Sequence, residues 1–253
     1  MKLIIYGFFF AYFIYMKMKC VKNARYIVSI VLSIVFIFIC SLMYSIDSEY
    51  VFSYHNEKVF YSGNKTHKNV SLMFNVYWGT EYIENILSIL NKYDIKATFF
   101  IGGSWLEDNY DMMFQIYSLG HEIGNHGYLH KNHNKMDYNL NLGEIKATHN
   151  LIKEYFNIEM NLFAPPSGEY NNATIEVCND INYHLIMWSK DTIDWRDQDI
   201  NLIYNRAISS VSNGDLVLMH PTEATIKALP MIITYLIANG YNIVTVSQNI
   251  FAV

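Results

Sequence analysis

The chain has 253 residues, enough for one large domain with appendages. Its formal net charge of −5 at pH 7 argues against nucleic acid as a partner, because that would require a clustered basic face, and its three cysteines are too few for a disulfide framework. Hydrophobic residues make up 52% of the sequence, which is high for a wholly soluble protein and points to a membrane segment.

The apolar excess is concentrated near the start of the chain. Residues 26–46 form an uncharged run, and about 20 such residues suffice to span a bilayer as a helix. Charged residues flank the run on both sides, basic before it and acidic after it: Lys17, Lys19, Lys22, Arg25, Asp47 and Glu49. The positive-inside rule therefore predicts a transmembrane segment over about 26–46, with everything after residue 46 outside the cytoplasm. A buried core helix fits less well, because no polar face interrupts the run.

A shorter apolar run over 3–15 is open to two interpretations. It is either a first span, or it lies upstream of a true start at Met16 or Met18, where the basic stretch becomes the charged region of a signal anchor. We therefore assign 1–46 to a membrane anchor region. Residues 47–69 are polar and contain the turn signal Ser62-Gly63-Asn64, so they are predicted as a spacer or small hairpin.

From residue 70 onward, short apolar strands alternate with amphipathic helices, and 70–253 is predicted as one domain. The predicted strands are 71–74, 97–101, 121–124, 161–164, 185–188, 215–219 and 242–246. The predicted helices are 81–93, 108–119, 142–156, 173–180, 200–210 and 222–239. Such alternation implies a parallel sheet with right-handed crossovers. Seven strands without a dinucleotide-binding motif favour an α/β fold of the distorted (β/α)7 barrel type, closed or nearly closed, over an open doubly wound sheet.

Unusual polar residues follow five of these strands. They are Asn75, His126 with His130, Pro165-Pro166-Ser167-Gly168, Asp191 with Asp194, and His220. In barrels of this kind the chemistry gathers at the C-terminal ends of the strands, so a single active site is predicted there. His126 and His130 are four residues apart, and one helical turn at that spacing would place both imidazoles on one face as two ligands of a metal ion.

Five motifs occur in a specific order between residues 97 and 222. They read Ala-Thr-Phe-Phe-Ile-Gly-Gly from Ala97, Gly-His-Glu-Ile-Gly-Asn-His from Gly120, Phe-Ala-Pro-Pro-Ser-Gly from Phe163, Trp-Ser-Lys-Asp-Thr-Ile-Asp-Trp from Trp188, and Leu-Met-His-Pro-Thr from Leu218. Together they resemble the polysaccharide deacetylase family, also called the NodB-homology domain or carbohydrate esterase family 4, over roughly 70–246. The sequence of residues 74–79 most resembles that of the sporulation-associated branch of the family in spore-forming bacteria.

The resemblance implies metal-dependent hydrolysis of N-acetyl groups on cell-wall or spore-wall amino sugars. In the family, two histidines and an aspartate hold a divalent ion, commonly zinc, while an aspartate acts as general base and a late histidine protonates the departing amine. Carried over by position, His126 and His130 are the metal ligands and His220 is the general acid. Asp191 would orient or tune a catalytic partner.

The same resemblance assigns the walls of the site. Ser167, directly after Pro166, would supply a backbone N–H for the oxyanion. Trp195 and Leu218 would wall the acetyl pocket. The implied partner is an N-acetylated glycan such as peptidoglycan, reached by an extracytoplasmic domain anchored in the membrane.

The family pattern breaks at three positions. Active members carry Thr-Phe-Asp-Asp-Gly in the first motif, but here Asn75 stands where the base should be, and an amide cannot take a proton from water. Val76 stands at the metal-ligand position and has no donor atom. Ala164 replaces the arginine that orients the base. A site without its carboxylate ligand should bind metal weakly and with little selectivity.

Two functions therefore remain open, besides a metal-dependent deacylase that acts on a small molecule outside the wall. In the first, Glu81 or Asp194 supplies the missing carboxylate, and the two histidines hold a metal with the help of water. In the second, the domain binds wall glycan, or serves as a scaffold, without deacetylating it.

Overall fold

The structure is a computed structural model that describes residues 33–38 and 59–252. The chain divides into two compact units, residues 1–56 and 57–253. In the first unit, 33–38 are helical. No helix among the described residues is both long and apolar enough to cross a membrane. Most of the predicted span over 26–46 falls outside those residues, so the membrane anchor stays a prediction.

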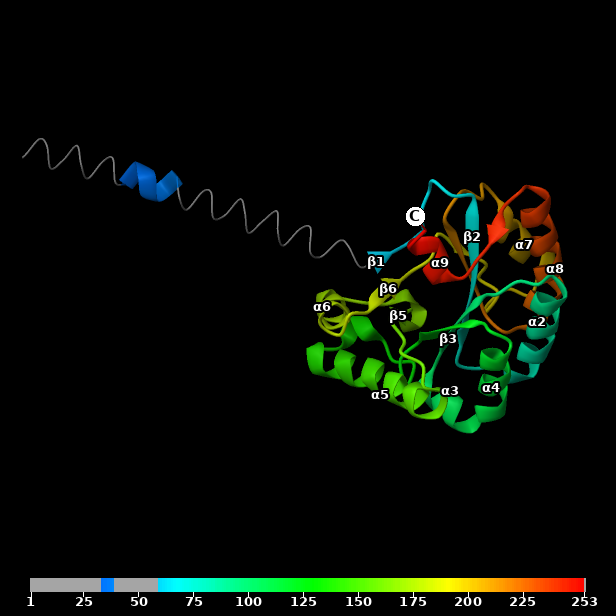
Figure 1. The fold of residues 1–253 in the computed structure, drawn as a ribbon, viewed down its shortest axis with the longest axis horizontal. Coiled ribbons are helices and arrows are strands. Elements are labelled where there is room, and N and C mark those ends of the chain that lie inside the picture. Colours follow the sequence, from blue (N-terminus) through cyan, green and yellow to red (C-terminus); the bar gives the residue numbers. More distant parts are fainter. Residues whose placement is uncertain (1–32, 39–58, 253) are drawn as a thin grey trace, which may run out of the picture. The chain divides into compact units, whose positions relative to one another are not determined.

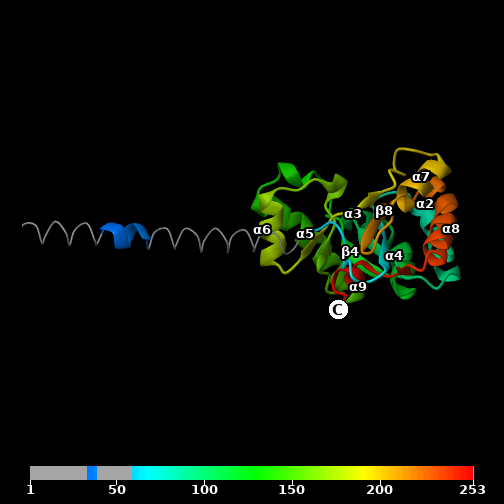
Figure 2. The same ribbon diagram turned by 90° about the horizontal axis from the view of Figure 1, so that it is seen from above.

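The second unit is built from parallel strands with helices around them (Figures 1 and 2). Its strands are β1 (Val59–Phe60), β2 (Asn69–Val76), β3 (Thr98–Ile101), β4 (Glu122–Asn125), β5 (Leu162–Phe163), β6 (His184–Ile186), β7 (Lys190–Asp191), β8 (Asp215–Met219) and β9 (Asn242–Ile243). Its helices are α2 (Thr80–Lys92), α3 (Gly103–Asp108), α4 (Tyr110–Ser118), α5 (Tyr138–Phe156), α6 (Asn172–Asp180), α7 (Ile200–Ile208), α8 (Glu223–Ala238) and α9 (Val246–Ile250), with 3-10 turns η1 (His133–Lys135) and η2 (Pro166–Gly168).

Every predicted strand and helix overlaps an observed element. Besides the two 3-10 turns, two strands and two helices were not predicted: β1, β7, α3 and α9. The last of these also shortens the predicted strand over 242–246. Thr245 caps α9, because its side chain accepts from Gln248 N while the Gln248 side chain returns to the Thr245 N–H. This capping box starts a helix where the apolar pattern alone predicted continued strand.

The strands follow the order β1-β6-β5-β4-β3-β2-β8-β7, with β9 paired to β2, and all pairs are parallel. One segment, 184–191, contributes a strand near each end of this order, β6 next to β1 and β7 at the other edge. Its first part, β6, pairs with β5, and its last part, β7, pairs with β8. The sheet is therefore a curled parallel half-barrel, consistent with the predicted (β/α)7 fold, with β1 and β7 as its edges rather than a closed ring.

Residues 57–69, predicted as part of a spacer, belong to the compact unit. Val59 and Phe60 of β1 pair with Leu185 and Ile186 of β6, and Met187 N donates to Phe60 O at 2.8 Å. This strand escaped prediction because it is only two residues long and its hydrogen-bonding partner is distant in sequence.

Alternation along β2 sorts its side chains into two layers. Leu72, Phe74 and Val76 are fully buried in the large core cluster that includes residues of the surrounding helices. Met73 belongs to a second cluster inside the curled sheet, with Phe100, Leu162, Ala164, Ile186, Leu216, Leu218 and Val246. Because successive residues of a strand face opposite sides, Asn75 points inward with Met73, whereas Val76 points toward the helices.

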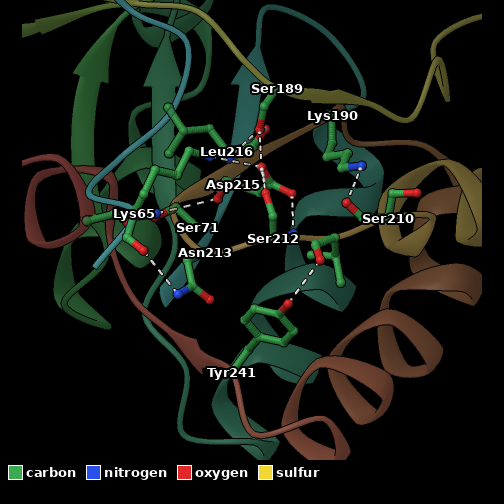
Figure 3. Close-up of polar contacts among 12 residues, drawn as sticks. Lys65, Ser71, Ser189, Lys190, Ser210, Ser212, Asn213, Asp215, Leu216 and Tyr241 are labelled. Atoms are coloured by element: carbon green, nitrogen blue, oxygen red, sulfur yellow. Dashed lines mark hydrogen bonds and ion pairs between the residues drawn. The ribbon is translucent and has the colours of Figure 1, made fainter. Parts of the chain in front are cut away.

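The amino ends of the strands are tied together by polar contacts around Asp215, the first residue of β8 (Figure 3). The Asp215 carboxylate is 3% exposed and accepts from Ser189 Oγ at 3.0 Å, Ser212 N at 2.8 Å and Ser212 Oγ at 3.1 Å. Lys65 Nζ lies 3.5 Å from it. The Asp215 carboxylate thus contacts three segments: the stretch before β2 that carries Lys65, the segment 184–191 that carries Ser189, and the loop before β8 that carries Ser212.

The Asp215 contacts yield a prediction about stability. We expect Asp215→Asn to lower the free energy of unfolding by about 1–3 kcal/mol, because hydrogen bonds to a charged acceptor are lost and an amide NH2 would face other donors. Denaturant unfolding of the full-length chain measures this. The control, Glu84→Gln, removes a charge from an exposed position on α2 and should change stability by less than about 0.5 kcal/mol. Equal effects of the two substitutions would contradict the assignment.

Candidate active-site pocket

A pocket of about 420 Å³ opens at the carboxyl ends of the strands. Its lining residues are Asn75, Tyr77, Trp78, His126, His130, Ser167, Trp195 and His220. Six of these were predicted to meet in one site, and the structure brings them together. Tyr77 and Trp78 were not assigned from the sequence. The strand-end rule could have found them, since both directly follow β2.

The histidine pair lies in a loop and not on a helix. His126 directly follows β4, and the backbone turns through positive φ at Gly127 (73°) and His130 (52°). The expectation of a helical turn is therefore wrong, although the two rings do come together, with centroids 5.1 Å apart and planes at 70°. Backbone in the left-handed region, and not a helical turn, therefore brings the two imidazole rings together.

His126 is almost fully buried, and its Nδ1 lies 2.7 Å from Ala164 O. A nitrogen facing a carbonyl must carry the proton, so the neutral ring keeps Nε2 as an acceptor. Burial first, and then the neighbouring His130, hold the pKa of His126 well below its ordinary value. Burial also lowers the pKa of His130. Both rings are therefore neutral at pH 7.

The loop that carries this pair is held by Glu144 of α5 and Asn125 of β4, two residues that the sequence did not single out. Glu144 Oε2 accepts from Tyr128 N at 3.0 Å and from Leu129 N at 2.7 Å. Asn125 Oδ1 accepts from Gly127 N at 2.8 Å. Lys131 Nζ lies 3.0 Å from Glu144 Oε1. Glu144 lies in α5, which follows the histidine loop along the chain, and none of the five motifs includes it.

His220 is oriented by Asp194. Its Nδ1 lies 2.8 Å from Asp194 Oδ1, and its backbone N donates to Asp194 Oδ2 at 2.7 Å. Thr225 Oγ1 also donates to that oxygen, at 2.6 Å. Asp191, which was predicted to orient or tune a catalytic partner, uses its carboxylate to accept from Ile193 N at 2.8 Å. The motif spacing does not reveal this local turn, which leaves Asp194, and not Asp191, beside His220.

The missing carboxylate is not replaced from elsewhere in the described residues. Asp194 is fully buried, and both of its oxygens already accept hydrogen bonds. Glu81 is exposed in the first turn of α2 and is not part of the lining. In this structure neither residue takes the place that Asn75 and Val76 leave without a carboxylate, so the alternative that Glu81 or Asp194 replaces it gains no support.

The walls differ in part from the expected ones. Trp195 is 53% exposed at the pocket rim, and Trp78, 42% exposed, stacks on His220 with ring centroids 5.8 Å apart and planes at 4°. Ser167 lines the pocket from η2, above the buried Pro166. Leu218, predicted as a wall, is 2% exposed and packs in the interior cluster outside the lining. It faces inward like Met73, one layer below the pocket.

The donor set does not fit a catalytic metal ion. Such a zinc site uses three protein ligands and keeps one position open. Here the two predicted ligands, His126 and His130, are imidazoles, and the side chain at the third position, Val76, is apolar and packs on the helix side of β2. Within 33–38 and 59–252, no three His, Cys, Asp or Glu side chains are grouped so that they could hold a metal ion.

Comparison with known proteins places these features in a family. The polysaccharide deacetylase family profile matches residues 62–186. A peptidoglycan-N-acetylglucosamine deacetylase of Bacillus cereus is 32% identical over 66% of this chain and 81% of its own length. Protein YlxY of Bacillus subtilis is 36% identical over 74% of this chain, and this match spans 59% of YlxY.

A solved structure with the same fold is described as a CE4 family pseudoenzyme from Bacillus anthracis. It has a TM-score of 0.74 and 35% identity over 76% of this chain and 68% of its own. A mutant of that pseudoenzyme is described as having restored enzymatic activity.

The support of the histidine loop yields a second prediction. Burial acts to raise the pKa of the Glu144 carboxyl, but the Leu129 N–H and the Lys131 ammonium outweigh it, and the pKa lies below its ordinary value of 4.5. Glu144→Gln should therefore lower the free energy of unfolding by about 1–3 kcal/mol at pH 7 and speed hydrogen exchange at Tyr128 and Leu129.

The pH dependence follows from the direction of this shift. A lowered carboxyl pKa stabilises the fold at pH values above 4.5, and the contribution is lost as the pH falls through the folded-state value. The stability difference between wild type and Glu144→Gln should thus shrink below pH 4.5. Glu154→Gln, exposed on the same helix, is the control and should leave both amides protected. Unchanged hydrogen exchange at Tyr128 and Leu129 in Glu144→Gln would show that Glu144 does not hold the histidine loop.

Proposed function

Because this chain belongs to the polysaccharide deacetylase family, we propose that it binds N-acetylated amino-sugar polymers of a cell or spore wall, with peptidoglycan foremost, in the pocket at the strand ends. Relatives named as peptidoglycan-N-acetylglucosamine deacetylases support this substrate class. The exposed rings of Trp78 and Trp195 at the pocket rim also suit a sugar, whose faces are apolar.

The proposal includes impaired hydrolysis. The observation that carries it is the identity and direction of two adjacent residues: Asn75 faces the pocket without a titratable group, and Val76 faces the helix-side core. General base catalysis needs a group that can take a proton from water, and an amide does not. The likeness to a CE4 family pseudoenzyme supports the same conclusion.

A reduced deacetylase activity is the second candidate, and the pair of His220 and Asp194 favours it. Asp194 holds Nδ1 of His220, so that Nε2 is the nitrogen left for a ligand in the pocket. A histidine oriented in this way can deliver a proton to a leaving amine. The two neutral histidines His126 and His130 are retained as well.

We also propose that the domain acts outside the cytoplasm, anchored by the predicted span over 26–46, and that it belongs to the sporulation-associated branch of the family. The basic residues before the span and the acidic residues after it support the orientation. The amino-acid sequence of residues 74–79 supports membership of the sporulation-associated branch.

Restoring both carboxylates tests the impairment. We expect the wild-type chain to release no acetate from N-acetylglucosamine oligomers or peptidoglycan with any divalent metal, and we expect Asn75→Asp/Val76→Asp to release it. Asn75→Asp alone should stay inactive, because it supplies a base without a third metal ligand. The double variant should also unfold at a lower temperature, since the carboxylate at position 76 must leave the apolar layer that holds Val76 in order to reach the two histidines. Acetate release by the wild type at the rate of the double variant would refute impairment.

Chelation separates binding from metal-dependent catalysis. Affinity for tri-N-acetylchitotriose, measured by calorimetry on the full-length chain, should be unchanged by EDTA, because the pocket lining can contact the sugar without an ion. Dialysis against buffer alone is the control. Binding that disappears with EDTA and returns with zinc would instead favour a metal site.

A further inference from the structure

Asn75 presents an unused hydrogen-bond acceptor at the floor of the pocket. The residue is 4% exposed, and its Oδ1 has no hydrogen-bond partner among the described residues. A buried oxygen of this kind is costly unless a donor reaches it, so it requires an explanation. Asn75 is also part of the pocket lining, which makes a ligand in the pocket one source of such a donor.

The surroundings leave the pocket as the open side. Below Asn75 the interior of the half-barrel is filled by the apolar cluster that includes Met73, Phe100 and Leu218, each at most 2% exposed. Phe100 is the strand partner of Asn75 in β3. The apolar layer offers no side-chain donor, and the pocket is the side from which a ligand can supply one.

The lining indicates which donor fits. It contains aromatic rings, imidazoles, one amide and two hydroxyls, and no Asp, Glu, Lys or Arg is among the lining residues that the structure describes. An uncharged ligand is favoured, because a cation would lose its hydration without gaining a carboxylate. The exposed indoles of Trp78 and Trp195 favour a ligand with apolar faces. An N-acetylated amino sugar combines both properties and carries one amide N–H.

We propose that Asn75 Oδ1 accepts a hydrogen bond from the acetamido N–H of the bound sugar, so that the pocket selects N-acetylated over deacetylated amino sugars. This inference rests on the proposed function, since it names how the same pocket recognises its ligand. A free amino sugar carries an ammonium group near neutral pH and would find no counter-charge in the lining. The residue at the position of the family's base thus becomes a recognition residue.

The sign of the selectivity depends on the charge at position 75. In wild type, the neutral oxygen accepts from the acetamido N–H. In Asn75→Asp, a carboxylate of the same shape would pair with an ammonium, so the preference should move toward the deacetylated sugar. In Asn75→Leu, the acceptor is lost, and the acetamido N–H would be buried without a partner.

Calorimetry with two trimers tests this on the full-length chain. Wild type should bind tri-N-acetylchitotriose at least about tenfold more tightly than the glucosamine trimer, the size expected from one buried hydrogen bond and one uncompensated charge. Asn75→Leu should lose about tenfold in affinity for the acetylated trimer. Asn75→Asp should lower the ratio of the two affinities about tenfold or more. Acetate is monitored in the same samples. Glu154→Gln, exposed on α5 and outside the lining, is the control and should leave the ratio unchanged.

The outcomes separate the two proposals. If wild type binds neither trimer nor peptidoglycan, the proposed function fails. If wild type binds the acetylated trimer but Asn75→Asp keeps the wild-type ratio, or a folded Asn75→Leu keeps the wild-type affinity, glycan binding stands and the role of Asn75 is overturned. Circular dichroism establishes folding, and if Asn75→Leu fails to fold, the nearly isosteric Asn75→Asp decides.

Discussion

The alternation of side chains along β2 is the constraint on which the rest of the site depends. β2 pairs with β3 and β8 along most of its length, and this ladder fixes which side chains face the interior. Adjacent residues must therefore face opposite layers. Asn75 closes the floor of the pocket, whereas Val76 is buried on the helix side. The two departures from the family motif thus differ in kind: one changes the chemistry of the pocket, and the other places an apolar side chain in the core.

The crossing segment 184–191 brings the second half of the site into place. Its first part, β6, pairs with β5, and its last part, β7, pairs with β8. The loop after β7 therefore lies beside the end of β8. Asp194 in that loop then reaches His220, and Trp195 reaches the pocket rim. At the opposite end of the strands, Asp215 fastens the same segment through Ser189. Contacts far from the pocket therefore help to determine its shape.

The electrostatics of the pocket differ from those expected of a metallohydrolase. The lining has no carboxylate, burial lowers the pKa of His126 and His130, and the side-chain oxygen of Asn75 has no hydrogen-bond partner among the described residues. Such a pocket is suited to neutral, amide-bearing ligands. The retained pair of His220 and Asp194 shows that a proton-delivering group can persist beside a lost base, since its geometry depends on its own loop and on α8 and not on position 75.

The sequence by itself determined the parallel α/β fold, the helices and longer strands, and the gathering of Asn75, His126, His130, Ser167, Trp195 and His220 at one end of the strands. Periodicity and the strand-end rule suffice for these, because they depend on local apolar pattern and on the direction of parallel strands. Only the tertiary structure decided that Asp194 and not Asp191 holds His220, that Glu144 supports the histidine loop, that β1 and α9 complete the unit, and that Leu218 lies below the pocket. Each of these rests on a turn, a cap or a contact between residues distant in sequence, and such contacts leave no period in the chain.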